Sequence, residues 1–419
     1  MKDISRFFTI YWIIYFPTCI AYNDLPGFSS IDEVMTGILL VYTFMKYNNR
    51  SINRRPWKEF TVCIGLIAFY IVYSLLFGAN VAGAVWLDLM QEIRPYAIIY
   101  CTWILNPRFT KKQKKWMLGT MVITLFSWIF YHPQTLDTQV EAEFPVLGQL
   151  AICTGMSWYL FTKETKRNRN IALLLVLTGM LAPKFKFMGE VVCFIAFVFF
   201  IKQRLNFKSP KTMIYVVLLV TVILMVTWTR FDAYYVSGLS NDELARPMTY
   251  KTSLRILWDY LPFGSGMGSF ACNGAWKFFS PLYYKYNLTG IWGLSPEMGY
   301  FICDAYYPTL AQFGIVGVFF FCWFWKRRLA TFDIIADMRY YRVAMITFCC
   351  LAIEQTADSS WLSGKGMGYC MLIALCLNAN RNMMEQRRRE EMRKKMLEKR
   401  RMAENSETEE LKLAENIKS

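Results

Sequence analysis

The sequence predicts an all-α fold: a polytopic transmembrane helical bundle of about 12 spans, with one large, partly helical loop between spans 9 and 10. Apolar residues make up 55% of the 419 residues and lie in long blocks, which is typical of membrane helices and not of a soluble core. Basic residues gather in every second loop between these blocks, as the positive-inside rule expects. Within residues 1–380, the one long polar interruption covers residues 230–307 and defines the large loop.

Twelve apolar segments account for the spans. Crossing a bilayer takes roughly 20 apolar residues, and fewer where the protein shields the helix ends. The segments cover residues 7–21, 31–46, 60–76, 85–105, 116–131, 145–161, 171–181, 187–201, 213–228, 309–325, 343–353 and 366–377. Every even-numbered loop between them is basic, so these loops and both termini are predicted to be cytoplasmic. Residues 1–380 therefore form one transmembrane domain, and residues 381–419 form a charged cytoplasmic tail.

The large loop carries basic residues on the side of the membrane where they are normally scarce. These residues are Arg230, Arg246, Lys251, Arg255, Lys277 and Lys285. Two interpretations stay open: a solvated amphipathic surface, because long loops translocate largely regardless of charge, or a site for an anionic ligand. Arginine binds phosphate through paired hydrogen bonds and stays charged, so the second interpretation points to a phosphorylated ligand. Aromatic residues of the loop, such as Tyr284, suit sugar stacking and interfacial anchoring equally well.

Several charged residues fall at membrane depth, where each needs a partner or a purpose. Arg94 in the fourth span is expected to pair with a group on another span. Lys184 and Lys186 lie at the outer turn between spans seven and eight. Glu354 and Asp358 are one helical turn apart, and because like charges repel at this spacing they should face water or a cation. For the three basic residues, an ion pair and contact with a ligand both remain open.

Motifs of the common soluble enzyme classes are missing from the sequence. The glycines at 264, 266 and 268 lack the strand–helix context of a dinucleotide or phosphate loop, so they indicate a tight turn or the close approach of a ligand. The twelve cysteines show no metal-binding spacing, and no metal or cofactor is expected. A disulfide between Cys272 and Cys303 stays open. Much of the net charge of +16 lies in short loops and the tail, which disfavours a nucleic-acid partner.

The order of motifs in the large loop matches a known pattern. Arg246 precedes a Pro-Phe-Gly-Ser-Gly-Met-Gly turn at residues 262–268, and Asp304 precedes a Gln-Phe-Gly-Ile-Val-Gly helix start at residues 312–317. This arrangement resembles the bacterial O-antigen ligase and Wzy-like polysaccharide polymerase superfamily. The resemblance covers about residues 246–317, and elsewhere only the number of spans and the position of the loop support it.

The resemblance implies a membrane glycosyltransferase of the bacterial inner membrane, with the large loop in the periplasm. Its donor would be an oligosaccharide repeat unit carried on undecaprenyl pyrophosphate. The enzyme would polymerise such units into an O-antigen, a capsule or an exopolysaccharide. Membrane lipids are expected partners, and a chain-length regulator is a further partner that the resemblance allows.

The resemblance also implies roles for individual residues. Arg246 would contact the pyrophosphate with Arg255 and Lys251 as helpers, because fixed cations stabilise the charge that grows on the leaving group. Asp304 would orient or deprotonate the acceptor hydroxyl. The candidate catalytic residues are thus Arg246, Asp304 and Arg255. The candidate substrate contacts, from the resemblance and from the residue patterns above, are Lys184, Lys186, Lys251, Arg94, Gly264, Gly266 and Tyr284.

Two alternatives to a polymerase stay open. A ligase of the same superfamily would transfer a finished glycan to lipid A core or to protein. Ligases tend to have His or Asn where this chain has Asp304, which favours the polymerase. A flippase or other transporter of lipid-linked oligosaccharides is the alternative from another class. Transporters are often built from two matching halves, whereas this sequence shows no such repeat and has one dominant loop after span nine.

Overall fold

The computed structural model of the chain describes residues 2–24, 28, 30–49, 52–131, 144–181, 184–206, 208–386, 388, 390–392 and 396–398. Helices make up most of these residues and no strand occurs among them, so the all-α prediction is confirmed for this part of the chain. Most of the predicted charged tail, residues 381–419, lies outside the described residues.

Among the described residues, twelve helices coincide with the twelve apolar segments of the sequence. They are α1 (Lys2–Asp24), α2 (Ile31–Met45), α3 (Trp57–Phe77), α4 (Ala82–Leu105), α5 (Lys111–Tyr131), α6 (Phe144–Phe161), α7 (Lys166–Leu177), α8 (Phe185–Ile195), α9 (Pro210–Phe231), α13 (Gly314–Asp333), α14 (Met338–Ala357) and α15 (Met367–Leu377). Four helical stretches in the described chain are long and apolar enough to cross a membrane: Lys2–Tyr22, Trp57–Phe77, Pro210–Ser240 and Tyr307–Asp333.

The apolar helices differ in what surrounds them. Every residue of α15 is buried, and this helix packs against α4 and α14 at the centre of the bundle. By contrast, only 6% of the most apolar stretch within Pro210–Ser240, which includes α9, is buried inside the protein. A helix that is apolar on all sides belongs either in a protein core or against lipid, and α15 and α9 represent these two cases. The outer face of α9 therefore suits contact with acyl chains.

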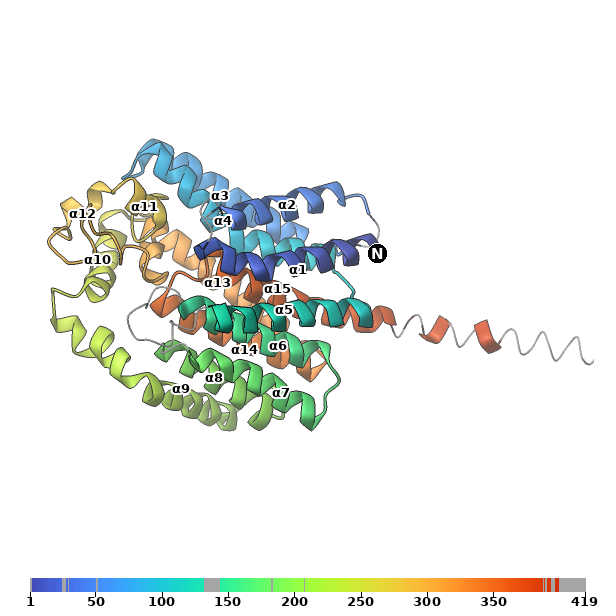
Figure 1. The fold of residues 1–419 in the computed structure, drawn as a ribbon. Coiled ribbons are helices and arrows are strands. Elements are labelled where there is room, and N and C mark those ends of the chain that lie inside the picture. Colours follow the sequence, from blue (N-terminus) through green and yellow to red (C-terminus); the bar gives the residue numbers. More distant parts are fainter. Residues whose placement is uncertain are drawn as a thin grey trace, which may run out of the picture.

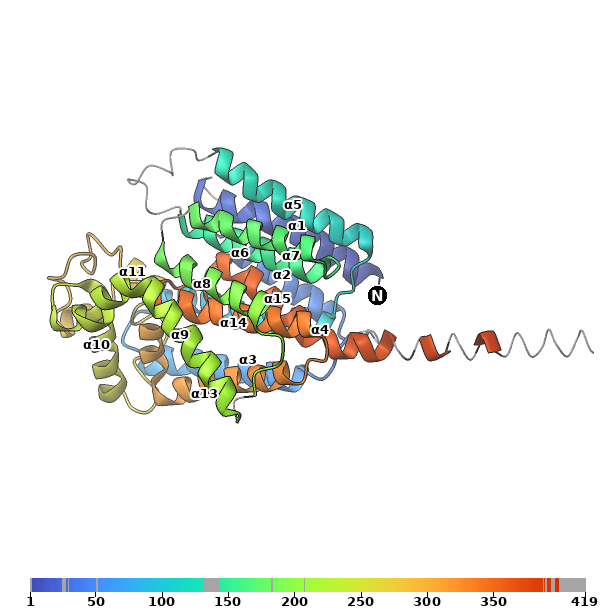
Figure 2. The same cartoon turned by 90° about the horizontal axis from the view of Figure 1, so that it is seen from below.

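The segment between α9 and α13 folds as a unit at one end of the bundle, which we call the cap (residues 232–306). It contains α10 (Ala245–Asp259) and two short helices, α11 (Asn273–Lys277) and α12 (Pro281–Lys285). Figures 1 and 2 show the cap, in yellow tones, at the end opposite to the N-terminus and the C-terminal residues. The cap has an apolar core of its own around Phe270 and Tyr283. The polar interruption in the sequence is thus a folded element.

The glycine-rich turn at residues 262–268 seats the cap on the bundle. Gly264 has a φ of +83° and faces Gly314, whose φ is +59°, and both values lie in the region that favours glycine. A Cβ on Gly264 would lie 2.3 Å from the Gly314 nitrogen, so the two chain segments approach too closely for a side chain. The backbone N–H of Gly266 donates to the Gln312 carbonyl at 2.9 Å, and that of Gly268 donates to the Asp88 carboxylate at 2.9 Å. These bonds fix the cap to α4 and to the start of α13.

Candidate functional site

Arg246 lies in the first turn of α10 and extends from the cap to the end of α14. Its guanidinium forms an ion pair with Asp304 and donates to the Ala357 carbonyl at 3.3 Å. The guanidinium carbon also lies 4.2 Å from the centre of the Tyr234 ring, which is a cation–π contact. The side chain is 12% exposed. Arg246 is therefore mostly buried, with one acidic partner and with an aromatic ring against its guanidinium.

Asp304 lies in the last loop of the cap, just before the short 3₁₀ helix Tyr307–Phe313. Two hydrogen bonds hold this loop on the bundle: Ser359 Oγ donates to the Cys303 carbonyl at 2.8 Å, and Tyr306 N donates to the Gln355 carbonyl at 3.1 Å. Burial raises the pKa of Asp304 above its ordinary value, and the nearby Arg246 opposes this rise. Asp304 is thus a positioned carboxyl group that accepts a proton more readily than an ordinary aspartate.

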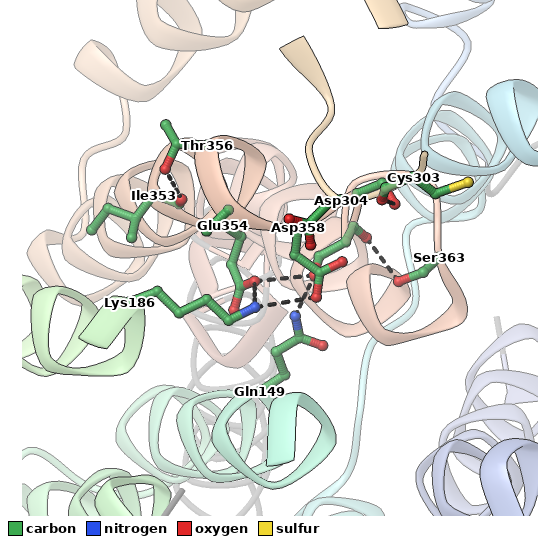
Figure 3. Close-up of polar contacts among 12 residues, drawn as sticks. Gln149, Lys186, Cys303, Asp304, Ile353, Glu354, Thr356, Asp358 and Ser363 are labelled. Carbon is green, nitrogen blue, oxygen red and sulfur yellow. Dashed lines mark hydrogen bonds and ion pairs between the residues drawn. The ribbon is translucent and has the colours of Figure 1, made fainter. Parts of the chain in front are cut away.

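Lys186 lies in the first turn of α8 and binds two acids at the far end of α14. Its ammonium nitrogen is 2.6 Å from Glu354 Oε2 and 3.2 Å from Asp358 Oδ2, as Figure 3 shows. Ser360 Oγ donates to the same Glu354 oxygen at 3.0 Å, and Gln149 Nε2 donates to Ser360 Oγ at 2.5 Å. The prediction that the two acids face water or a cation is confirmed, and Lys186 is that cation.

The two ion-pair groups meet where the cap rests on the bundle. Asp358 and Lys186 are both close enough to Asp304 to influence its pKa. Figure 3 shows Asp304 and Asp358 on neighbouring segments. We call the set Arg246, Asp304, Lys186, Glu354 and Asp358 the junction site. It combines fixed cations, which suit an anionic ligand, with a carboxyl group that can take a proton. Within the described residues, no group of three or more His, Cys, Asp or Glu side chains is arranged to hold a metal ion.

Lys251 and Arg255 lie on the same helix as Arg246 but on its opposite face. With about 3.6 residues per turn, they are rotated from Arg246 by about 140° and about 180° around the helix axis. Lys251 pairs with Asp242 at 2.8 Å, and the side chain of Arg255 is exposed. The structure therefore does not bring these two predicted helpers to the junction site.

Arg94 is buried inside the bundle and its partners belong to the protein itself. It pairs with Asp32 at 2.8 Å and with Glu33 at 2.6 Å, both in the first turn of α2, and it donates to the Leu362 carbonyl. The prediction of a partner on another span is confirmed. Arg94 connects α2, α4 and the loop before α15, so its contacts are structural. Its charge is already paired, and it is not a candidate for substrate binding.

The space around Gly264 and Gly266 is filled by the protein. A Cβ on Gly264 would collide with residues 311–314, and a Cβ on Gly266 would lie 2.9 Å from Gly78 Cα. The tight turn expected for these glycines is therefore present, whereas the expected close approach of a ligand has no room at this backbone.

The remaining predicted residues lie outside the junction site. Lys184 is the N-cap residue of α8, two residues before Lys186, and is partly exposed. Tyr284 lies on α12 with 58% of its surface exposed, and its ring meets that of Phe279 edge-on. Cys272 and Cys303 are both free thiols, so the disulfide left open by the sequence is not formed.

Sequence reasoning names Asp358 but misses the rest of the loop between α14 and α15, residues 358–366. This loop supplies Asp358 and Ser360 to the junction, and its Lys365 lowers the pKa of Asp358 together with Lys186, against the effect of burial. An indication was available in the sequence: the run Asp-Ser-Ser-Trp-Leu-Ser-Gly-Lys-Gly places several polar residues and glycines between two spans. Irregular polar backbone between two apolar helices is tolerated where it is covered by protein or lines a site.

A scan against protein-family models finds no match for the chain, and a search of curated proteins finds no match either. Its function therefore has to be inferred from its own residues and their arrangement.

Proposed function

We propose that the chain is a membrane glycosyltransferase that polymerises oligosaccharide repeat units carried on undecaprenyl pyrophosphate. The observation that carries this proposal is the convergence of Arg246, Asp304 and Lys186 at one junction. The motif order of the large loop names Arg246 and Asp304 together, and the basic turn before α8 names Lys186 separately. At the end of an apolar bundle, an arginine with a single acidic partner suits a substrate with a lipid tail, a diphosphate and a sugar, because a diphosphate can replace that partner.

The reaction follows from the charges at the junction site. The acceptor hydroxyl oxygen attacks the anomeric carbon of the donor sugar, and the hydroxyl proton passes to the Asp304 carboxylate. The bond between the anomeric carbon and the diphosphate oxygen breaks, and the lipid diphosphate leaves with the electron pair. Negative charge grows on the leaving group, so a guanidinium fixed beside it lowers the barrier.

Arg246 has to exchange partners for this reaction to occur. In the resting arrangement its guanidinium is paired with Asp304. A diphosphate carries more negative charge than one carboxylate and offers oxygens for paired hydrogen bonds with arginine. Donor binding would therefore draw Arg246 toward the diphosphate and release Asp304 to act as the base.

The proposal includes the finer topology that the sequence predicts. The bundle would cross the bacterial inner membrane about twelve times, with both termini in the cytoplasm and the cap in the periplasm. Three observations support this: twelve helices coincide with the predicted spans, basic residues occupy every second loop, and the cap lies at the opposite end from the N-terminus (Figure 1).

The decisive experiment replaces Arg246 with Ala in the source organism after deletion of the native gene. We expect the surface polysaccharide to collapse to single repeat units on a gel, while the variant still accumulates in the membrane. Lys251→Ala is the matched control, because it lies on the same helix but on the outer face, and it should restore long chains.

Long chains in the Arg246→Ala strain would refute the proposal. Long chains that are made but not attached in the deletion strain would indicate a ligase, and donor trapped in the cytoplasmic leaflet would indicate a flippase.

A further inference from the structure

Acids outnumber the cations that face them around the junction site. Glu190 lies one turn after Lys186 on α8, is completely buried and faces Glu354. Among the described residues and contacts, four carboxyl groups lie in this region, those of Glu190, Glu354, Asp358 and Asp304, and three cations act on them, Lys186, Lys365 and Arg246. One carboxylate would remain without a counter-charge. A buried carboxyl group in this position takes up a proton, because a buried and unpaired carboxylate has a higher free energy than the neutral, protonated group.

The pair formed by Glu190 and Glu354 is where this proton fits. Both residues are 0% exposed. Glu190 Oε2 accepts a hydrogen bond from the Tyr369 hydroxyl at 2.9 Å, and Glu354 Oε2 binds Lys186. The other oxygen of each glutamate, Oε1, is buried with no hydrogen-bond partner among the described residues, and the same holds for Gln149 Oε1. Two adjacent carboxylates strongly disfavour double ionisation, whereas one proton between them converts repulsion into a hydrogen bond.

We propose that Glu190 and Glu354 share one proton and, with Lys186, form a proton-binding site inside the bundle. A metal ion is a poorer occupant, because the Lys186 ammonium already stands against Glu354. The titratable groups that act on Glu190, Glu354 or the side chains in contact with them are Lys186 and Cys193 on α8, Cys153 on α6, Cys350 on α14 and Tyr369 on α15. On helix α9, Ile223 and Thr227 lie against Gly189 of α8, and the one charged contact described toward this part of α8 is Arg230, whose guanidinium lies over the Phe185 ring at 5.8 Å.

This site would hold a proton next to the ion pair that contains Asp304. Lys186 is common to both groups, since it contacts Glu354 and Asp358 and acts on Asp304. Buried acids of membrane proteins are often members of proton relays. The proton site follows from charge and contacts alone, so it does not depend on the proposed glycosyltransferase function.

Infrared spectroscopy of the full chain in lipid nanodiscs tests the shared proton directly. The C=O stretching band of protonated carboxyl groups is measured at neutral pH for the wild type and for Glu190→Gln and Glu354→Gln. We expect each single variant to lose the intensity of one protonated carboxyl group, because the remaining glutamate is then ionised and balanced by Lys186. Glu59→Gln is the matched control: it removes a carboxylate that pairs with Arg327 and Arg328, and it should leave the band unchanged.

A second variant reverses the direction of the effect. Lys186→Met removes one cation and keeps all four carboxyl groups, so the region should bind a second proton and the band should grow by one carboxyl group. This measurement decides the matter even if a glutamine variant does not fold, and thermal melting in the same nanodiscs establishes which variants are folded. An unchanged band in both folded glutamine variants, or an unchanged or smaller band in Lys186→Met, would overturn the proposal.

Discussion

Arg94 and Arg246 are both mostly buried and both paired with acids, yet their surroundings differ in kind. The side chain of Arg94 is 2% exposed and binds two acids on α2 together with a backbone carbonyl. Arg246 is 12% exposed and binds a single acid on a loop, and that acid is itself 27% exposed. One arginine joins helices inside the bundle, while the other lies where two folded parts of the chain touch.

The difference indicates which arginine can take a new partner. Removing Arg94 from its acids would leave two carboxylates facing each other in the interior, so the exchange is unfavourable. Asp304 is partly reachable by water and lies beside the cation Lys186, so it tolerates the loss of Arg246 more easily. A buried arginine is therefore a candidate for ligand binding only when its acidic partner remains stable after the arginine moves away. The predictions below test this distinction.

The largest effect on stability is expected for Arg94→Met. This change leaves Asp32 and Glu33 without a cation in the bundle and should cost about 3–5 kcal/mol, as expected when one partner of a buried ion pair is lost. The measurement is thermal unfolding of the purified chain in nanodiscs. Arg246→Met should lower the unfolding temperature much less. Equal losses for the two variants would mean that both arginines are structural.

The largest effect on activity is expected for Arg246→Ala. Loss of one fixed donor at a developing negative charge lowers the rate about 100-fold to 1,000-fold. The rate of glycan elongation with a lipid-linked donor measures this. Arg246→Lys should be intermediate, because lysine keeps the charge but cannot form the paired hydrogen bonds. If Arg246→Lys were as slow as Arg246→Ala, geometry and not charge would dominate at this position.

The pH dependence of activity sharpens the role assigned to Asp304. A base has to be ionised, so activity should fall as pH drops through the pKa of Asp304. Burial raises this pKa, so the fall of activity on the acid side of the pH profile, which we call the acid limb, should occur at higher pH than for an ordinary aspartate. Arg246 opposes the rise, so Arg246→Ala should move the limb further toward high pH in the residual activity, and Asp304→Asn should remove the limb. A shift toward low pH in Arg246→Ala would contradict this assignment.

The smallest effect is expected for Lys251→Ala and Arg255→Ala. Both side chains point away from the junction site, and Lys251 only forms a surface ion pair with Asp242. Pairs of this kind contribute about 0–1 kcal/mol to stability. Elongation should remain within about twofold of wild type in the same assay. A loss comparable to that of Arg246→Ala would place the outer face of α10 in the site.

Local pattern was enough to predict the helices, because apolar blocks are a property of the sequence itself, and motif order singled out Arg246 and Asp304, which the structure pairs. Pattern could not show which face of α10 meets the bundle, so Arg255 is predicted beside Arg246 although helix rotation takes it to the other side. The spacing of Glu354 and Asp358 predicts water or a cation as their neighbour, but only folding brings Lys186 from 168 residues away to be that cation. Lys365 was missed because its loop resembles an ordinary connection.

The glycine turn at residues 262–268 also constrains how the molecule can admit a bulky lipid. Along α3, α4 and α13 the cap is held through the backbone of its glycine turn, where no side chain fits, by hydrogen bonds to side chains such as Asp88 and to backbone groups such as the Gln312 carbonyl. Toward α14 the cap is held by side chains, such as the Tyr235 hydroxyl that donates to the Thr356 carbonyl at 2.6 Å, and by the Tyr306 N–H that donates to the Gln355 carbonyl at 3.1 Å. The glycine turn therefore leaves no passage along α3, α4 and α13, and the proposed lipid-linked donor would enter laterally, past the exposed apolar face of α9.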